Sequence, residues 1–220
     1  MTPKVLYVCT EIFPLLKTGG LADVSAGLPP ALMAQGADVR LLLPAFPSVV
    51  AGVAPEGSAL LVPAGGSLGL PAGLGPQALS ANGPTPWLRA GRITDSGIPV
   101  WLLHAPGLYE RAVNPYLDDS GEPWPNSAEQ FAWLGWAAAL LGTGLSSSWL
   151  PDVVHGHDWH TGLAFAYLHE LARTAEHRLV LPDRQNLHLP HSAVYNGITW
   201  SPGFTLVTPS PTSWTMPAPS

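Results

Sequence analysis

The sequence contains a single cysteine, Cys9, among 220 residues. One cysteine cannot form a disulfide framework, and this usage is typical of a cytoplasmic protein, so we expect a cytoplasmic location. Cys9 falls inside the first predicted strand. We therefore interpret it as a small buried apolar side chain rather than as a nucleophile.

Charged residues are also scarce, and basic residues are fewer than acidic ones. Nine Lys and Arg stand against fifteen Asp and Glu, which leaves a net charge of −6. A basic patch that could bind a phosphate backbone is missing, so we expect no nucleic-acid partner. Apolar runs long enough to span a bilayer are missing too, and the chain enters a strand without a signal peptide, so we expect no membrane association.

What the sequence does contain is a glycine turn, Lys17-Thr-Gly-Gly-Leu-Ala-Asp23, between a predicted strand and a predicted helix. The unbroken apolar run over 4–10 is typical of a strand buried on both faces, and Leu21 begins a stretch with helical spacing. Gly19 and Gly20 let a ligand approach the backbone, and the first N–H groups of the helix attract anions. With the charge of Lys17 beside them, this pattern indicates a phosphate or diphosphate site. A turn that needs glycine only for its geometry is the alternative.

Proline and glycine positions predict where the remaining helices and strands begin and end. Pro29 and Pro30 should kink or break the helix that begins at Leu21, and Gly36 should end its continuation. A second strand over 38–43 would complete a β-α-β unit. We expect loops and at most a short edge strand over 52–86, and a strand pair over 87–94 and 98–104.

Further along, 107–125 reads as a long surface loop of the kind that carries function. Ser127 and Gln130 fit a capping box at the start of the next helix, in which Trp133 and Trp136 are better explained as core residues. A strand over 151–155 and a helix over 161–175 follow.

The loop after that strand concentrates polar side chains, namely His155, His157, Asp158 and His160. Such loops at the carboxyl edge of an α/β sheet line ligand crevices. Hydrogen bonds from imidazole and carboxylate to a hydroxylated substrate are the favoured interpretation. A metal site and histidines satisfied by neighbouring backbone are the alternatives.

Five segments, in order, resemble bacterial glycogen synthases and plant starch synthases. They are 4–24, Leu41-Leu-Leu-Pro-Ala-Phe-Pro47, Ala105-Pro-Gly-Leu-Tyr-Glu-Arg111, Asn114-Pro-Tyr-Leu-Asp118 and Pro151-Asp-Val-Val-His-Gly-His-Asp-Trp-His-Thr-Gly162. The resemblance extends to about His177.

The resemblance implies the N-terminal, Rossmann-like half of a GT-B glycosyltransferase, with a mainly parallel sheet flanked by helices. It implies transfer of glucose from ADP-glucose to an α-1,4-glucan, with no metal. By this analogy Lys17, Thr18, Gly19 and Gly20 bind the diphosphate or the donor region. The catalytic residues that it implies are Asp23, near the acceptor or sugar, and His160, near the transferred glucose. The remaining substrate-binding positions implied by the analogy are Asn126, His157 and Asp158.

Two departures from the family pattern bear on activity. Asn126 and Gln130 stand where the family usually has a carboxylate and an arginine. We also expect 1–177 to be an incomplete catalytic domain and 178–220 to be a non-homologous, disordered tail. The chain alone should then be inactive, and a non-catalytic glucan- or nucleotide-binding module or a non-functional product are the alternatives.

Overall fold

The computed structural model describes residues 2–65, 75–77, 85–110, 114–175, 192–195 and 198–200, with 173–175 and the last two ranges as backbone only. The elements of these residues are β1 Lys4–Val8, α1 Gly20–Ala34, β2 Asp38–Pro44, α2 Pro47–Ala51, β3 Val53–Leu61, β4 Trp87–Ile93, β5 Pro99–His104, α3 Ser127–Gly142, β6 Val153–Gly156, the short 3-10 helix Trp159–Thr161, α4 Leu163–Ala175, β7 Ser192–Tyr195 and β8 Ile198–Trp200.

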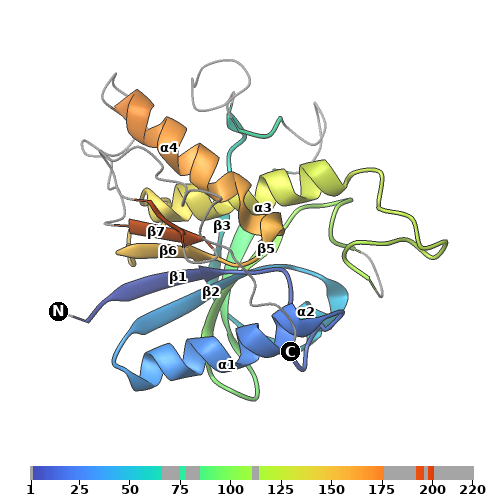
Figure 1. Cartoon of the computed structure of the whole chain (residues 1–220), viewed down its shortest axis with the longest axis horizontal. Coiled ribbons are helices and arrows are strands. Elements are labelled where there is room, and N and C mark those ends of the chain that lie inside the picture. The colour runs from blue at the N-terminus through green and yellow to red at the C-terminus, as the bar shows by residue number, and fades with distance from the viewer. Residues whose placement is uncertain are drawn as a thin grey trace, which may run out of the picture.

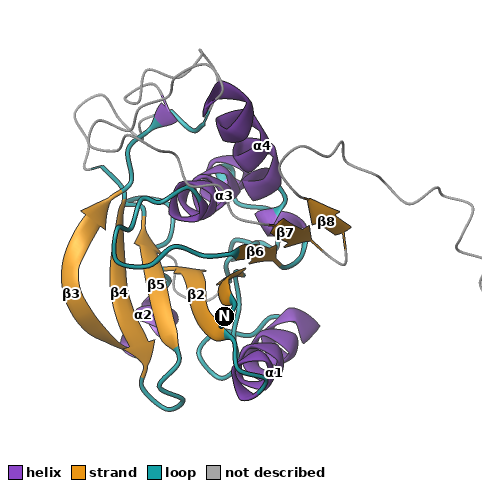
Figure 2. Cartoon of the chain, turned by 90° about the vertical axis from the view of Figure 1, so that its left-hand side faces the viewer, coloured by secondary structure: helices purple, strands orange, loops and turns teal. Residues whose placement is uncertain are grey.

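All the described strands form one sheet in the order β3-β4-β5-β2-β1-β6-β7-β8. The strands from β5 through β2, β1 and β6 to β7 are parallel, whereas β4 pairs antiparallel with both β3 and β5, and β8 with β7. Helices α1 and α2 lie on one side of the sheet and α3 and α4 on the other (Figures 1 and 2). The predicted α/β fold with a mainly parallel sheet is confirmed.

The apolar runs that predicted the central strands form the core. Leu6, Tyr7 and Val8 of β1 are fully buried, and so are Trp133 and Trp136 of α3, which confirms both as packing residues. Cys9 is also fully buried, and burial raises the pKa of its thiol to about 12. The thiol therefore stays protonated, as expected of an apolar core residue.

The structure of α1 differs from the prediction that Pro29 and Pro30 break the first helix. The helix continues through Pro29 and Pro30 to Ala34 as one element, so the predicted break does not occur. Ala22, Ser25 and Pro29 form a buried stripe at helical spacing, and packing of this stripe on the sheet outweighs the donors that proline removes. Gly36, at φ 91°, ends the helix as predicted.

The second correction concerns β3, which covers Val53–Leu61 where we expected loops and at most a short edge strand. The strand lies at the sheet edge, so most of its side chains are exposed and it lacks the apolar alternation that marks a half-buried strand. Its register against β4 shifts between Glu56 and Leu60. Main-chain pairing with β4, rather than side-chain pattern, defines this strand.

The predicted capping box at the start of α3 is not formed. The helix begins at Ser127 itself, whose hydroxyl turns back to donate to the Trp124 carbonyl at 2.8 Å. The Gln130 side chain is fully buried and donates to the Pro115 carbonyl at 3.1 Å. Gln130 therefore anchors the preceding loop on α3 instead of capping the helix.

The predicted tail, 178–220, falls mostly outside the described residues. Within it, however, Ser192–Tyr195 forms β7, parallel to β6, and Ile198–Trp200 forms β8. These two short strands belong to the sheet, and the prediction of a disordered tail stays a prediction for the remainder of 178–220.

Candidate functional site

The carboxyl ends of β1 and β6 lie side by side, because Val8 pairs with Gly156 and the His157 N–H donates to the Val8 carbonyl at 3.0 Å. Loops that follow the two strands therefore meet at one edge of the sheet, the usual position of a ligand site in such folds. A cavity of about 520 Å³ lies there, lined by Glu11, Thr18, Gly19, Gly20, Leu21, Asn114, Tyr116, Leu117, Asp158, Trp159 and His160. The structure thus brings together the two constellations that the sequence indicated separately.

Glu11 occupies the base of this cavity, and sequence reasoning missed it. Its carboxylate is buried and accepts hydrogen bonds from the Thr18 N–H, from the Thr18 hydroxyl at 2.7 Å, from the Gly19 N–H at 3.3 Å and from the Tyr116 hydroxyl. An acidic residue three positions after the apolar run of β1 was the available signal.

This arrangement changes the role expected of the glycine turn. The N–H groups of Thr18 and Gly19 point to Glu11, so an anion in the cavity would meet the first turn of α1, which begins at Gly20. The first N–H groups of a helix have no intrahelical partner and carry partial positive charge. Any anion in the cavity would thus have to bind at the helical end of the turn.

Lys17 and Asp23 lie outside the cavity lining and bind each other. The Lys17 ammonium is 2.7 Å from both carboxylate oxygens of Asp23, and about half of each side chain is exposed. The ammonium also lies 5.7 Å from the centre of the Phe13 ring. Two residues for which we predicted separate roles therefore form one surface ion pair at the start of α1.

His160 forms the aromatic wall of the cavity. Its ring stacks on Tyr116 at 4.5 Å between centroids and contacts Phe131 and Trp159 at 4.9 and 4.1 Å. Burial lowers the pKa of His160, an effect partly opposed by Asp158 and Glu11, and so favours the neutral imidazole. Its Nδ1 atom is buried and has no hydrogen-bond partner among the described residues.

Asp158 combines a ligand-type side chain with a strained backbone. Its φ of 64° and ψ of 170° lie in a region that residues other than glycine rarely adopt. The carboxylate accepts the Trp159 N–H at 2.7 Å, and the Thr161 hydroxyl donates to the Asp158 carbonyl at 3.0 Å. These bonds hold the turn that places Asp158, Trp159 and His160 together on the cavity.

Two further predicted substrate-binding residues, His157 and Asn126, do not line the cavity. His157 packs behind it, stacked on Tyr7 at 4.0 Å and 4.2 Å from His155, and its pKa is lowered to about 4 by burial and by His155. Asn126 donates to the Gly107 carbonyl at 3.4 Å. Among the described residues, no group of three His, Cys, Asp or Glu side chains is arranged to hold a metal ion.

A mainly parallel sheet between helix layers, with a cavity at its carboxyl edge, defines an α/β fold of the kind whose ligand sites usually lie at that edge. The family model of the starch synthase catalytic domain matches residues 4–198, and the chain belongs to this family. The match extends beyond residue 177 and includes β7.

Curated relatives are glycogen synthases. The chain is 49% identical over 167 residues to that of Paramagnetospirillum magneticum, which is 76% of this chain and 31% of the relative. It is 45% identical over 200 residues to that of Variovorax paradoxus, which is 89% of this chain and 36% of the relative. The chain thus spans about one third of the length of these relatives.

A solved structure shares the fold. The catalytic domain of starch synthase IV from Arabidopsis thaliana, bound to ADP and acarbose, superposes with a TM-score of 0.52 at 22% identity. The match covers 80% of this chain and 30% of that one. Separately, none of the helices in the described part of the chain is long and apolar enough to cross a membrane.

Proposed function

We propose that this chain is the donor- and acceptor-binding N-terminal part of a glycogen synthase, which transfers glucose from ADP-glucose to the end of an α-1,4-glucan. The observation that carries the proposal is the shared cavity, in which the first turn of α1 faces His160 and Asp158 across one space. Membership of the starch synthase catalytic domain family supports it, and so does ADP in the related Arabidopsis structure.

The chemistry follows from charge. Departure of a nucleoside diphosphate concentrates negative charge at the oxygens that leave, and oriented N–H dipoles at a helix start stabilise that charge. We propose that Lys17 leaves Asp23 to join this site when the diphosphate binds, since the exposed pair is held weakly. His160 and Asp158 then hydrogen-bond the glucose hydroxyls.

We further propose that the transfer needs no metal ion, because the lysine and the helix start supply the positive charge. ADP binding to the full chain should then be the same in excess EDTA as in magnesium. A requirement for a divalent cation would contradict this part of the proposal.

The chain by itself should bind but transfer little. The relatives are about three times longer than this chain. Without the part of the relatives that the chain does not cover, the reacting groups would be neither positioned nor shielded from water. The test is incorporation of radiolabelled glucose from ADP-glucose into glycogen by the purified chain, run beside NMR titrations with ADP and maltotriose.

We expect no incorporation above background, together with saturable ADP-induced shifts at Gly20 and His160. Incorporation that is lost in Lys17→Ala would show that this part of the fold suffices for catalysis. Absence of both ADP and maltotriose binding in a folded sample would overturn the assignment of the cavity.

A second candidate is a non-catalytic binding module. It is favoured by Gln130, which replaces the arginine of the family pattern and is buried as a structural anchor of the 114–116 loop. Glucan binding without ADP binding would support this candidate over the first.

A further inference from the structure

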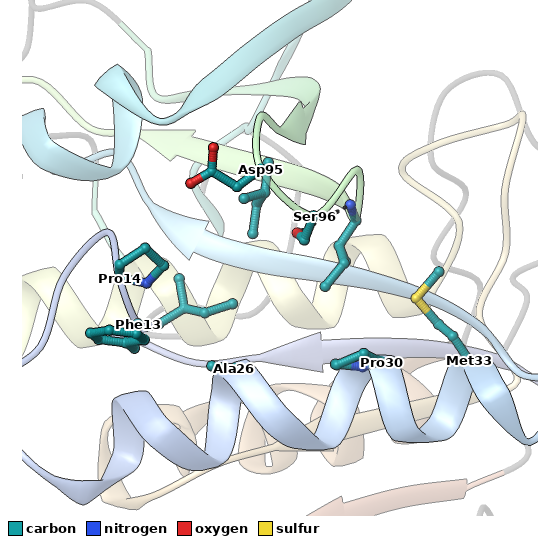
Figure 3. Close-up of a pocket in the computed structure, with 10 residues that line it drawn as sticks. Phe13, Pro14, Ala26, Pro30, Met33, Asp95 and Ser96 are labelled. Carbon is teal, nitrogen blue, oxygen red and sulfur yellow. Dashed lines mark hydrogen bonds between the residues drawn. The ribbon is translucent and has the colours of Figure 1, made fainter.

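A second, smaller pocket lies away from the cavity, on the side of the sheet covered by α1. Its volume is about 240 Å³, and three segments that are distant in sequence form its walls (Figure 3). One wall is the loop before the glycine turn, with Ile12, Phe13 and Pro14. The second wall is one face of α1 and the third is the β4–β5 turn.

The walls of the pocket are apolar and well supported. Ala26, Pro30 and Met33 follow each other at helical spacing on α1 and face the turn residues across the pocket (Figure 3). The turn is closed by the Ile93 N–H, which donates to the Ile98 carbonyl at 3.0 Å, and by the Gly97 N–H, which donates to the Ile93 carbonyl at 2.7 Å.

One charge stands at the rim. Asp95 is exposed and contributes to the lining, with Ser96 beside it (Figure 3). The ion pairs found among the described residues do not include Asp95, and the nearby Arg92 is occupied by Glu56 and the Gly97 carbonyl. Within the described part of the chain, the Asp95 carboxylate at the rim of this apolar pocket therefore has no ion-pair partner.

We propose that this pocket binds a small organic cation, an apolar ring or branched chain that carries one protonated amine. An apolar cavity of roughly 150 Å³ accepts benzene, so the space here suits one ring with a short substituent. The apolar part would pack among Phe13, Pro30 and Met33, and the ammonium would pair with Asp95. Phe13 is 53% exposed and Met33 is 39% exposed, so an occupant of the pocket would bury both.

The pocket and the candidate site have no lining residue in common, but the chain segment 11–20 contributes to both: Ile12, Phe13 and Pro14 line the pocket, and Glu11 and Thr18 line the cavity. The Ile12 N–H donates to the Leu16 carbonyl at 3.1 Å, and the Leu16 N–H donates to the Ile12 carbonyl at 2.9 Å. Residues 12–16 therefore form one tight loop. Glu11 precedes this loop, and Lys17, over the Phe13 ring, follows it. A molecule that contacts Phe13 would therefore move the segment that holds Thr18 and Gly19 on Glu11.

The probe for this site is 2-phenylethylammonium, compared with uncharged 2-phenylethanol and anionic phenylacetate. Binding to the full chain is followed by the NMR methyl signals of Ile12, Met33, Ile93 and Ile98. We expect saturable shifts, with the ammonium bound about two- to five-fold tighter than the alcohol, as an exposed ion pair allows. The amide signals of Thr18 and Gly19 should shift with the same dissociation constant.

Variants separate the charge from the shape. Asp95→Asn should remove the preference for the ammonium, and Glu129→Gln, an exposed charge on α3, should leave it intact. Ala26→Met should fill the pocket and abolish the shifts for all three probes.

Unsaturable shifts, or equal affinity for ammonium and carboxylate probes, would overturn the proposed site. If Ala26→Met does not fold, the Asp95→Asn comparison decides alone. Methyl shifts without any shift at Thr18 and Gly19 would overturn the connection to the cavity.

Discussion

Tyr116 stacks on His160 with their ring planes 15° apart, and the Tyr116 hydroxyl donates to the carboxylate of Glu11. Through this pair, the loop after β1 and the loop after β6 are joined by a side chain from a third loop. The Thr10 hydroxyl lies 2.7 Å from the Tyr116 hydroxyl and adds to the same junction. Glu11 is therefore the residue on which both halves of the cavity depend.

Glu11→Gln should destabilise the protein although it preserves the size of the side chain. The amide offers one acceptor oxygen and places an NH₂ group against donors, so hydrogen bonds from Thr18, Gly19 or Tyr116 are lost. Since a hydrogen bond to a charged group contributes about 1.5–3 kcal/mol, we expect a loss of about 2 kcal/mol in urea unfolding. Glu129→Gln is the matched control, with an expected change below about 0.5 kcal/mol. Equal effects of the two variants would contradict the role of Glu11.

Asp23→Asn should strengthen ADP binding, whereas Lys17→Ala should weaken it. Removal of the Asp23 carboxylate frees the Lys17 ammonium from its partner at 2.7 Å and lowers the negative charge near the start of α1. Exposed pairs contribute about 0.2–1 kcal/mol, so each change should be within about five-fold. Calorimetric titration at low and high salt checks this, and both effects should shrink at high salt. Weaker binding in Asp23→Asn would show instead that the carboxylate itself contacts the ligand.

Acid should destabilise the fold through His157. Its folded-state pKa of about 4 is below the ordinary value of 6.5, so between these pH values the unfolded chain binds a proton that the folded chain excludes. The stabilisation is complete above pH 6.5 and is lost as the pH falls toward 4. Since one pKa unit corresponds to about 1.4 kcal/mol, and solvent screening reduces the effect, we expect a loss on the order of 2 kcal/mol.

Chemical unfolding as a function of pH measures this loss. His157→Phe keeps a ring stacked on Tyr7 and removes the titration, so its stability should vary less between pH 6.5 and 4. Some variation should persist, because burial also lowers the pKa of His155. An unchanged pH profile in His157→Phe would show that other groups cause the acid sensitivity.

Asp158→Gly should be more stable than Asp158→Ala, the reverse of the usual order. Both variants lose the hydrogen bond from the Trp159 N–H, but only glycine adopts φ 64° with ψ 170° without strain. Strain of this kind amounts to about 1–3 kcal/mol, so glycine should exceed alanine by about 1 kcal/mol or more in thermal or urea unfolding. The ordinary preference for alanine at this position would mean that the loop relaxes without difficulty.

Much of the fold was predictable because its signals are local. The apolar runs of β1 and β2, the paired strands β4 and β5, and the fully buried tryptophans of α3 all follow from residue type and spacing. Prediction from residue pattern failed where tertiary contacts determine the secondary structure. Pro29 sits within a continuous α1 because packing supports it, and β3 is a strand because β4 pairs with it.

The site divides in the same way. The glycine turn and the loop with Asp158 and His160 were recognisable as candidate ligand-binding segments, and residues of both line one cavity. Glu11 was not recognisable, because a single acidic residue has meaning only when its partners from distant loops are known.

The sequence by itself determined the parallel core, the glycine turn and the histidine-rich loop at its carboxyl edge, and the resemblance to glycogen and starch synthases. These features follow from periodicity and from sequence motifs. Only the tertiary structure decided that Lys17 pairs with Asp23. The same holds for the hydrogen bonds that Glu11 accepts from the N–H groups of Thr18 and Gly19. It also holds for His157, which stacks on Tyr7 rather than facing the cavity. Side-chain partners depend on distances across the folded chain, and local sequence does not contain those distances.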